Sequence, residues 1–234
     1  MQTAELLWPS RCAACDAFIP IGEAFCDPCQ TSVTPLDEAC GLCAMPTSTG
    51  TTCKRCALSP WPFAGVTCAT HYGGAVATAL VRFKHGRQDL TRLLCPLVFS
   101  GLSAVLNEGE ASKRYLVVPV PLHKRRLRQR GFNQAWNLAK AAAKSLPASQ
   151  RVDLDPWSLV RLRDGKHVEH ESIDERHVRA QDAFAVPQNS GICGRDTILI
   201  DDVLTTGATS CACADALLQA GARSVRLVTV ARTV

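Results

Sequence analysis

The residues best suited to chemistry follow an apolar run near the C-terminus. Residues 197–200 read Thr-Ile-Leu-Ile, and they lead directly into two acids, Asp201 and Asp202, and then into a small, hydroxyl-rich segment. An unbroken β-branched and apolar run of this kind is typical of a strand that is covered on both faces. Because α/β proteins bind ligands where such strands end, we expect a binding site at the two acids.

This order of residues suits a sugar phosphate. The carboxylates of Asp201 and Asp202 can accept hydrogen bonds from vicinal ribose hydroxyls, directly or through a hydrated Mg2+ ion. A glycine in the following loop permits the positive φ angle of an anion-binding turn, and the next helix presents its positive end. The expected phosphate loop comprises Thr205, Thr206, Gly207, Ala208 and Thr209. The alternative is an ordinary α/β turn in which Asp or Thr caps a helix.

The whole segment is more specific than a lone acid pair. It closely resembles the signature that binds 5-phosphoribosyl 1-pyrophosphate (PRPP) in type I phosphoribosyltransferases. In that family the two acids hold the ribose hydroxyls and the loop holds the 5-phosphate. The resemblance therefore implies a PRPP site with Mg2+ at Asp201, Asp202 and residues 205–209.

A second set of chemically active residues lies in the N-terminal quarter of the chain. Eight of the 13 cysteines form four Cys-x-x-Cys pairs: Cys12/Cys15, Cys26/Cys29, Cys40/Cys43 and Cys53/Cys56. Each pair places two thiolates on one tight turn, and two such turns complete a tetrahedral zinc site. We expect one or two structural Zn2+ ions; sequential and cross-braced pairings fit the spacing equally. The alternatives are a disulfide framework and a redox dithiol.

A basic run follows another predicted strand, which ends in Val-Pro-Val-Pro at residues 118–121. Six of the eight residues from 123 to 130 are His, Lys or Arg, and Gly131 and Asn133 then open a helix. We expect a basic loop that contacts pyrophosphate or the backbone of single-stranded nucleic acid. Its candidate contacts are Lys124, Arg125, Arg126, Arg128 and Arg130. The alternative is a solvated basic loop.

Strands and helices alternate after residue 62, which predicts a parallel sheet with covering helices. The expected strands span residues 63–72, 115–120, 197–200 and 224–231. The expected helices span residues 74–83, 89–106, 133–145 and 209–220. We expect Gly221 to end the last of these helices.

Taken together, these motifs resemble the ComF family, also called ComFC or GntX-like, along nearly the whole chain. Besides the cysteine pairs, the Val-Pro-Val-Pro run and the Asp-Asp motif, the resemblance is carried by residues 72–73, 83–86 and 130–134. It implies an α/β fold in which a type I phosphoribosyltransferase-like parallel sheet with flanking helices, residues 61–234, follows a small cysteine-rich zinc-ribbon domain, residues 1–60. By the same resemblance, the loop after Pro121 is expected at the pyrophosphate-loop position.

One segment departs from the family pattern. Between Arg161 and Phe184, at the position of the flexible lid, Gly165, Val168 and Arg179 replace the usual Thr, Gln and Asn. Other residues of the segment fit the pattern: Arg161, Arg163, Arg176, Ala183 and Phe184. The mismatches weaken any transfer of contacts made by the lid. Three histidines, His167, His170 and His177, are interpreted mainly as surface residues; the alternatives are metal ligands and proton carriers.

Composition sets further limits. The chain has 234 residues, of which 47% are hydrophobic, so it can bury a sizeable core. We find no run of 18 apolar residues and no secretory signal, and we expect a cytoplasmic protein with no membrane insertion. Because the formal net charge is only +5, any contact with nucleic acid must be local.

Three functions follow from these patterns. The first is a phosphoribosyltransferase of the glycosyltransferase class, in which a nucleophile displaces pyrophosphate from PRPP; the sequence identifies no general base and no acceptor. The second is a non-catalytic PRPP-sensing or DNA-binding adaptor. The resemblance links both to natural competence, with single-stranded DNA and competence-machinery proteins as partners. The third is a zinc module on a degenerate scaffold, against which the intact acid pair argues.

Overall fold

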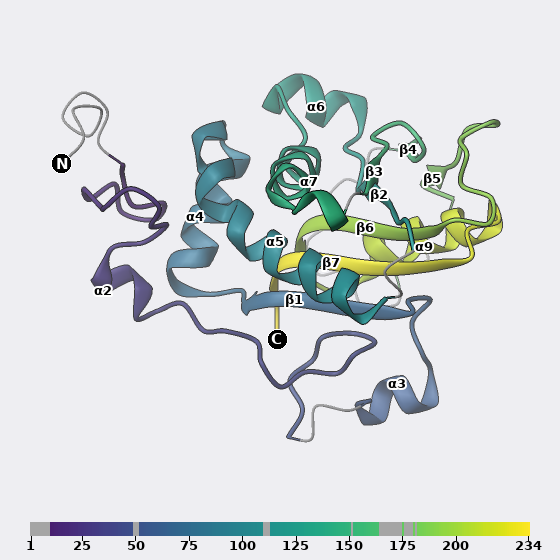
Figure 1. The fold of residues 1–234 in the computed structure, drawn as a ribbon, viewed down its shortest axis with the longest axis horizontal. Coiled ribbons are helices and arrows are strands. Elements are labelled where there is room, and N and C mark those ends of the chain that lie inside the picture. The colour runs from purple at the N-terminus through teal and green to yellow at the C-terminus, as the bar shows by residue number, and fades with distance from the viewer. Residues whose placement is uncertain are drawn as a thin grey trace.

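The computed structural model describes residues 10–48, 52–109, 113–150, 152–163, 175, 180 and 182–234. Its centre is a five-stranded parallel sheet with the strand order β1-β7-β6-β2-β3 (Figure 1). The strands are β1 (Gly65–His71), β2 (Leu116–Pro119), β3 (Asp153–Leu154), β6 (Asp196–Leu204) and β7 (Ser224–Arg232). Because all of them are parallel, their carboxyl ends meet at one edge of the sheet.

Both faces of the sheet are covered, as expected for a parallel sheet. One face carries α4 (Gly74–Lys84), α5 (Thr91–Glu108) and α7 (Gln134–Ser145), and the other carries α9 (Ala208–Gln219). Strand residues alternate between the two cores: in β6, Ile198 and Ile200 pack on the α4 side, whereas Leu199 packs on the α9 side. The prediction of an α/β fold with a parallel sheet and flanking helices is confirmed.

Short elements complete this part of the chain. The helix α6 (Lys124–Arg130) follows β2, and the strands β4 (Val160–Arg161) and β5 (Phe184–Ala185) form an antiparallel pair outside the main sheet. Two 3-10 turns, η1 (Gln88–Leu90) and η2 (Ala148–Gln150), precede α5 and follow α7. The expected basic loop is therefore wrong in one respect: seven of its residues are helical.

The helix α6 has clear boundary signals at both ends. The ring of His123 accepts a hydrogen bond from the backbone N–H of Arg125 at 3.3 Å, which caps the first turn. Gly131, at φ 80°, ends the helix in the left-handed conformation that glycine favours. In the sequence these two capping residues were not recognised, because the basic run between them is also typical of a solvated loop.

One helix within the described ranges, residues Gln88–Glu108, is long and apolar enough to cross a membrane by length and composition alone. In this fold its apolar residues pack against the sheet instead. Leu94, Val98 and Leu102 are fully buried, and the helix packs on β1 and β7. A covering helix of a parallel sheet accounts for this composition.

The N-terminal part contains the short helices α2 (Asp27–Gln30) and α3 (Lys54–Leu58) and runs alongside the open edge of β1 (Figure 1). Backbone hydrogen bonds join Leu36 N to Ala69 O at 3.2 Å, Val66 N to Gly41 O at 2.7 Å and His71 N to Thr34 O at 2.9 Å. These bonds occupy polar groups of an edge strand that would otherwise be open to pairing with another chain.

Candidate functional site

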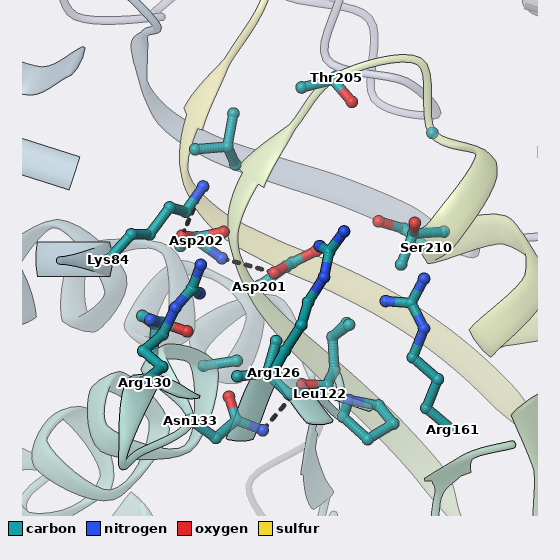
Figure 2. Close-up of a pocket in the computed structure, with 17 residues that line it drawn as sticks. Lys84, Leu122, Arg126, Arg130, Asn133, Arg161, Asp201, Asp202, Thr205 and Ser210 are labelled. Carbon is teal, nitrogen blue, oxygen red and sulfur yellow. Dashed lines mark hydrogen bonds and ion pairs between the residues drawn. The ribbon is translucent and has the colours of Figure 1, made fainter. Parts of the chain in front are cut away.

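An open pocket of about 260 Å³ lies at the carboxyl edge of the sheet (Figure 2). Side chains from β6, α4, α6, α7, β4 and the start of α9 converge on it. Its charged and polar lining residues are Lys84, Arg126, Arg130, Asn133, Gln134, Arg161, Asp201, Asp202, Thr205, Thr209 and Ser210. The pocket thus combines two acids with four cations, which suits an anionic ligand bound with a metal ion.

The two acids lie within the last part of β6 rather than after it. The backbone N–H of Asp202 donates to Oδ1 of Asp201 at 2.8 Å, and Nζ of Lys84 lies 2.9 Å from Oδ2 of Asp202. Burial, and next the negative charge of Asp202, raise the pKa of Asp201 to about 8. The ligand-free pair therefore retains a proton at neutral pH, which a divalent cation would displace.

The expected phosphate loop connects β6 to α9 in three residues, Thr205 to Gly207. Gly207 has φ 85° and is the N-cap residue of α9, so the loop turns through the left-handed conformation that the sequence predicted. The side chain of Thr206 accepts a hydrogen bond from the N–H of Ala208 at 3.4 Å. Thr205, Gly207 and Thr209 line the pocket, at the positive end of a 12-residue helix.

The cations of α6 divide into two groups. Arg126 and Arg130, one helical turn apart, line the pocket, and Figure 2 shows the guanidinium of Arg126 directed toward Asp201. Lys124, Arg125 and Arg128 are exposed and lie outside the pocket lining. Burial lowers the pKa of Arg130, while the charge of Asp202 opposes that shift.

Asn133 joins this wall of the pocket to the sheet. Its Oδ1 accepts from the N–H of Trp136 at 3.3 Å, which caps α7 as expected, and its Nδ2 donates to the carbonyl of Val120 at 3.0 Å. One side chain therefore fixes the start of α7 against the end of β2. The neighbouring Gln134 is only 3% exposed and lines the same pocket.

The eight paired cysteines form two tetrads. Cys12, Cys15, Cys26 and Cys29 make the first, and Cys40, Cys43, Cys53 and Cys56 make the second; within each tetrad the four Sγ atoms lie within 4.8 Å of one another. Sγ–Sγ distances of 3.6 Å for Cys15–Cys26 and 3.7 Å for Cys43–Cys53 match the roughly 3.8 Å expected around a tetrahedral Zn2+. The pairing is sequential, so the structure favours two ions over one.

Comparisons with known proteins agree with a zinc ribbon in the N-terminal part of the chain. Residues 3–57 match the family model of the double zinc ribbon domain. The DNA utilization protein YhgH of Escherichia coli K12 is 26% identical, over 96% of this chain and 98% of that protein. The competence protein ComFC of Bacillus subtilis is 28% identical, over 90% of this chain and 85% of that protein.

The chain is a ComF-like zinc-ribbon protein. A solved hypoxanthine phosphoribosyltransferase from Staphylococcus aureus superposes with a TM-score of 0.38 and 16% identity, over 58% of this chain and 61% of that chain. The family-level resemblance found in the sequence is confirmed by the matches that span nearly the whole chain and by the zinc ribbon.

The thiols of this ComF-like protein are prepared for a metal ion. Burial raises the pKa of Cys12, but backbone N–H donors, those of Cys15 and Cys26 first, outweigh it and lower the pKa to about 6. The same balance lowers the pKa of Cys40 to about 7. Burial and the neighbouring thiols raise the pKa of Cys29 to about 12. A tetrad thus needs a cation before all four sulfurs can carry charge, which is what structural Zn2+ supplies.

Two charged pocket residues of the ComF-like protein were not proposed as site residues from the sequence. Lys84 is the last residue of α4 and reaches Asp202, and Arg161 of β4 lines the opposite side, with its guanidinium 5.3 Å from the ring centre of Phe184. Both residues belong to motifs that the sequence showed: Lys84 stands in the Phe-Lys-His-Gly motif, and Arg161 stands in the lid pattern. Neither position had a neighbouring acid in the sequence to indicate its role.

Most of the expected lid lies outside the described residues. The residues concerned are Gly165, His167, Val168, His170, Arg176, His177 and Arg179. The two ends of the segment are described: Arg161 pairs in register with Phe184 in the small β4–β5 sheet. That pairing fixes Arg161 at the margin of the pocket.

Proposed function

We propose that this protein binds PRPP with Mg2+ in the pocket at the carboxyl edge of the sheet. The observation that carries the proposal is the convergence of the acid pair, the three-residue loop at the start of α9 and four cations on one open pocket. This set supplies acceptors for ribose hydroxyls, donors for a phosphate, and positive charge for a pyrophosphate. The ribose hydroxyls, the phosphate and the pyrophosphate are the three polar groups of PRPP.

We assign roles by chemistry. Asp201 and Asp202 accept hydrogen bonds from the ribose hydroxyls and from the water molecules bound to Mg2+, for which carboxylates are suitable partners. Residues 205–209, Thr205, Thr206, Gly207, Ala208 and Thr209, hold the 5-phosphate at the helix start. Lys84, Arg126 and Arg130 face the pyrophosphate, and Arg161 stands across the pocket. The exposed cations Lys124, Arg125 and Arg128 have no place in this ligand.

The same geometry suits transfer of the phosphoribosyl group. When an acceptor attacks the anomeric carbon, the bond to pyrophosphate breaks and its electrons leave with the pyrophosphate. Such a step needs positioned cations and in-line geometry more than a protein nucleophile. The bound Mg2+ would share in neutralising the departing charge. We therefore place the protein with phosphoribosyltransferase-like proteins and leave the acceptor undefined.

The biological setting follows from the relatives. One is named a DNA utilization protein and another a competence protein. We infer a role in the uptake or handling of single-stranded DNA for this chain as well. Because the tetrads require reduced cysteines, we place this role in the cytoplasm. We also propose that residues 1–60 form a zinc-binding domain and that residues 61–234 form a phosphoribosyltransferase-like domain.

The proposed site can be tested by titrating PRPP and Mg2+ into the zinc-loaded protein by calorimetry. We expect Mg2+-dependent binding of PRPP that is stronger than that of ribose 5-phosphate, because only PRPP reaches the cations of α6. Asp202→Asn should weaken PRPP binding at least tenfold, which corresponds to about 1.4 kcal/mol, since it removes a charged acceptor and the partner of Lys84.

Asp215→Asn is the matched control, since it makes the same change on α9 outside the pocket lining. Both variants should retain wild-type zinc content and circular dichroism. Unchanged PRPP affinity in Asp202→Asn, or equal affinity with and without Mg2+, would remove the basis of the site assignment.

A second candidate function is a DNA-binding adaptor without required turnover. The observation that favours it is the exposed set on α6, Lys124, Arg125 and Arg128, which the PRPP pocket does not use. Three cations on one short, exposed helix are suited to the backbone phosphates of a single strand. The two functions are compatible, because they use different sides of the same helix.

A further inference from the structure

A buried arginine lies between the second cysteine tetrad and the phosphate loop. Arg232, the last residue of β7, is 4% exposed. Its Nε donates to the carbonyl of Cys43 at 3.0 Å, and its Nη1 donates to the carbonyl of Leu204 at 3.0 Å and to that of Thr205. One guanidinium group therefore joins a cysteine of the tetrad to the first residue of the loop.

The other end of the loop is held by an aromatic ring from the same region. A Cβ atom on Gly207 would clash with the ring of Trp61, so the ring packs directly against this glycine. Trp61 also belongs to the apolar cluster around Cys40, Cys43 and Cys56, and its ring centre lies 5.9 Å from the guanidinium carbon of Arg232. Both ends of the loop thus rest on groups that contact the second tetrad.

Charge strengthens this connection. A buried guanidinium is costly unless neighbouring groups compensate it. Within the described residues, Arg232 forms no ion pair with a carboxylate; its acceptors are the backbone carbonyls and Sδ of Met45 at 3.2 Å. Four thiolates around one Zn2+ carry a formal charge of about −2, which would stabilise the cation beside Cys43.

The first tetrad is attached elsewhere. Nη1 of Arg82 donates to the carbonyls of Ala13 and Ala14 at 3.0 and 2.8 Å, and Arg82 also pairs with Asp16. These contacts join the first tetrad to α4. The two tetrads can therefore be compared within one chain: among the described residues, Arg232 joins the second tetrad to the phosphate loop and does not contact the first.

We propose that Arg232 is a positioning residue that couples the zinc-loaded second tetrad to the phosphate-binding loop. With zinc bound, the ordered tetrad fixes the Cys43 carbonyl, and Arg232 then holds the Thr205 carbonyl so that the loop amides face the ligand. Loss of zinc from this tetrad releases the loop and weakens binding of the 5-phosphate. The effect on affinity rests on the proposed PRPP site, whereas the effect on loop order does not.

The test uses the full zinc-loaded chain and the variant Arg232→Lys, which keeps the charge but loses the planar fork of donors. Two measurements are made: hydrogen exchange of the amides of residues 204–209, and calorimetric titration with PRPP and with ribose 5-phosphate. We expect at least tenfold faster exchange in the loop and at least tenfold weaker binding of both ligands, with zinc content unchanged.

Arg226→Lys is the matched control, because Arg226 lies on the same strand and pairs with Glu108 rather than with the loop. It should leave loop exchange and affinity at wild-type values. Cys56→Ser and Cys29→Ser then remove one ligand from the second and the first tetrad, respectively. Only the second-tetrad variant should accelerate exchange in residues 204–209, and it provides the same test if Arg232→Lys does not fold.

The two proposals fail differently. If the wild-type protein binds neither ligand, the PRPP site is wrong, and loop exchange still tests the coupling. If Arg232→Lys and Cys56→Ser both leave loop exchange at the wild-type rate, or if Cys29→Ser accelerates it equally, the coupling is wrong whatever the affinity. A loss of affinity without faster exchange would also overturn it.

Discussion

At the scale of single residues, the acid pair places two adjacent carboxylates in one pocket. Asp201 and Asp202 are neighbours in one strand, and only Asp202 has an ion-pair partner among the described residues, Lys84. Burial and the charge of Asp202 raise the pKa of Asp201 to about 8. Ligand-free protein therefore has to place a second negative charge in this pocket as pH rises.

The expected consequence is a pH-dependent loss of stability that Asp201→Asn relieves. The pKa of Asp201 is raised from 3.8 in an unfolded chain to about 8 in the folded one, so the folded state keeps a proton that the unfolded state has lost at pH values between these two. The free energy of unfolding therefore falls as pH rises from about 4 to about 8. At pH 8.5, without Mg2+ or ligand, the variant should unfold at a temperature about 2–4 °C or more above wild type.

The measurement is thermal unfolding of both proteins at pH 5.5 and pH 8.5. The gain should be larger at the higher pH, and the exposed Asp37, changed to Asn, should give no such difference. A variant that is equally stable relative to wild type at both pH values would show that Asp201 does not carry a raised pKa.

At the scale of secondary structure, α6 changes the interpretation of the basic run. As a flexible loop, all five cations could contact one ligand. As a helix, the run directs Arg126 and Arg130 to the pocket, while Lys124, Arg125 and Arg128 remain exposed on other sides. Helical periodicity thus separates candidate contacts for PRPP from candidate contacts for nucleic acid.

This separation predicts how two sets of substitutions differ. Changing Lys124, Arg125 and Arg128 together to Gln should weaken binding of a single-stranded oligothymidine and make its dependence of log K on log salt less steep by about 2, since each phosphate contact contributes about 0.7. PRPP affinity should stay at the wild-type value. Fluorescence anisotropy across a salt series, and calorimetry with PRPP, provide the two measurements.

The converse change, Arg126→Gln with Arg130→Gln, is the comparison for this experiment. It should reduce PRPP affinity and leave most of the salt slope for the oligonucleotide. If the three outer substitutions leave the salt slope unchanged, α6 is not the surface that binds a nucleic-acid backbone.

At the scale of the whole molecule, the zinc ribbon supports the sheet instead of standing apart from it. Residues near the first tetrad, among them Ala13 and Phe25, share a core cluster with α4 and α5. The segment before the second tetrad forms hydrogen bonds with the edge strand β1. Removal of zinc should therefore affect the stability of the sheet as well as that of the ribbon.

We expect two Zn2+ ions per chain, and a fall in the unfolding midpoint of roughly 10 °C or more when a chelator removes both, because structural zinc contributes folding free energy directly. Elemental analysis gives the stoichiometry, and thermal unfolding followed by circular dichroism of the helices gives the stability. Re-addition of Zn2+, but not of Mg2+, should restore the midpoint. One ion per chain, or an unchanged midpoint after removal, would contradict this arrangement.

Much of this molecule follows from its sequence because the signals are local. The run Thr-Ile-Leu-Ile predicted the central strand, Gly207 its turn, and each Cys-x-x-Cys pair its metal knuckle. The structure lengthens the strand to Asp196–Leu204 and begins α9 at Ala208, so that the acids lie inside the strand and the loop is shorter than expected. Hydrogen-bonded pairing with β7 extends the strand past the acids, and no single-strand pattern reveals such pairing.

The sequence by itself determined the chemistry that is available: two adjacent acids, a glycine turn, a cationic run and eight zinc ligands in four pairs. Tertiary structure alone decided which cysteine pairs share an ion, which cations face the pocket, and that Lys84 and Arg161 join them. It also placed Arg232 against Cys43, 189 residues away in the chain. Residue types and short spacings fix local geometry, whereas contacts across such separations exist only once the sheet has closed the chain on itself.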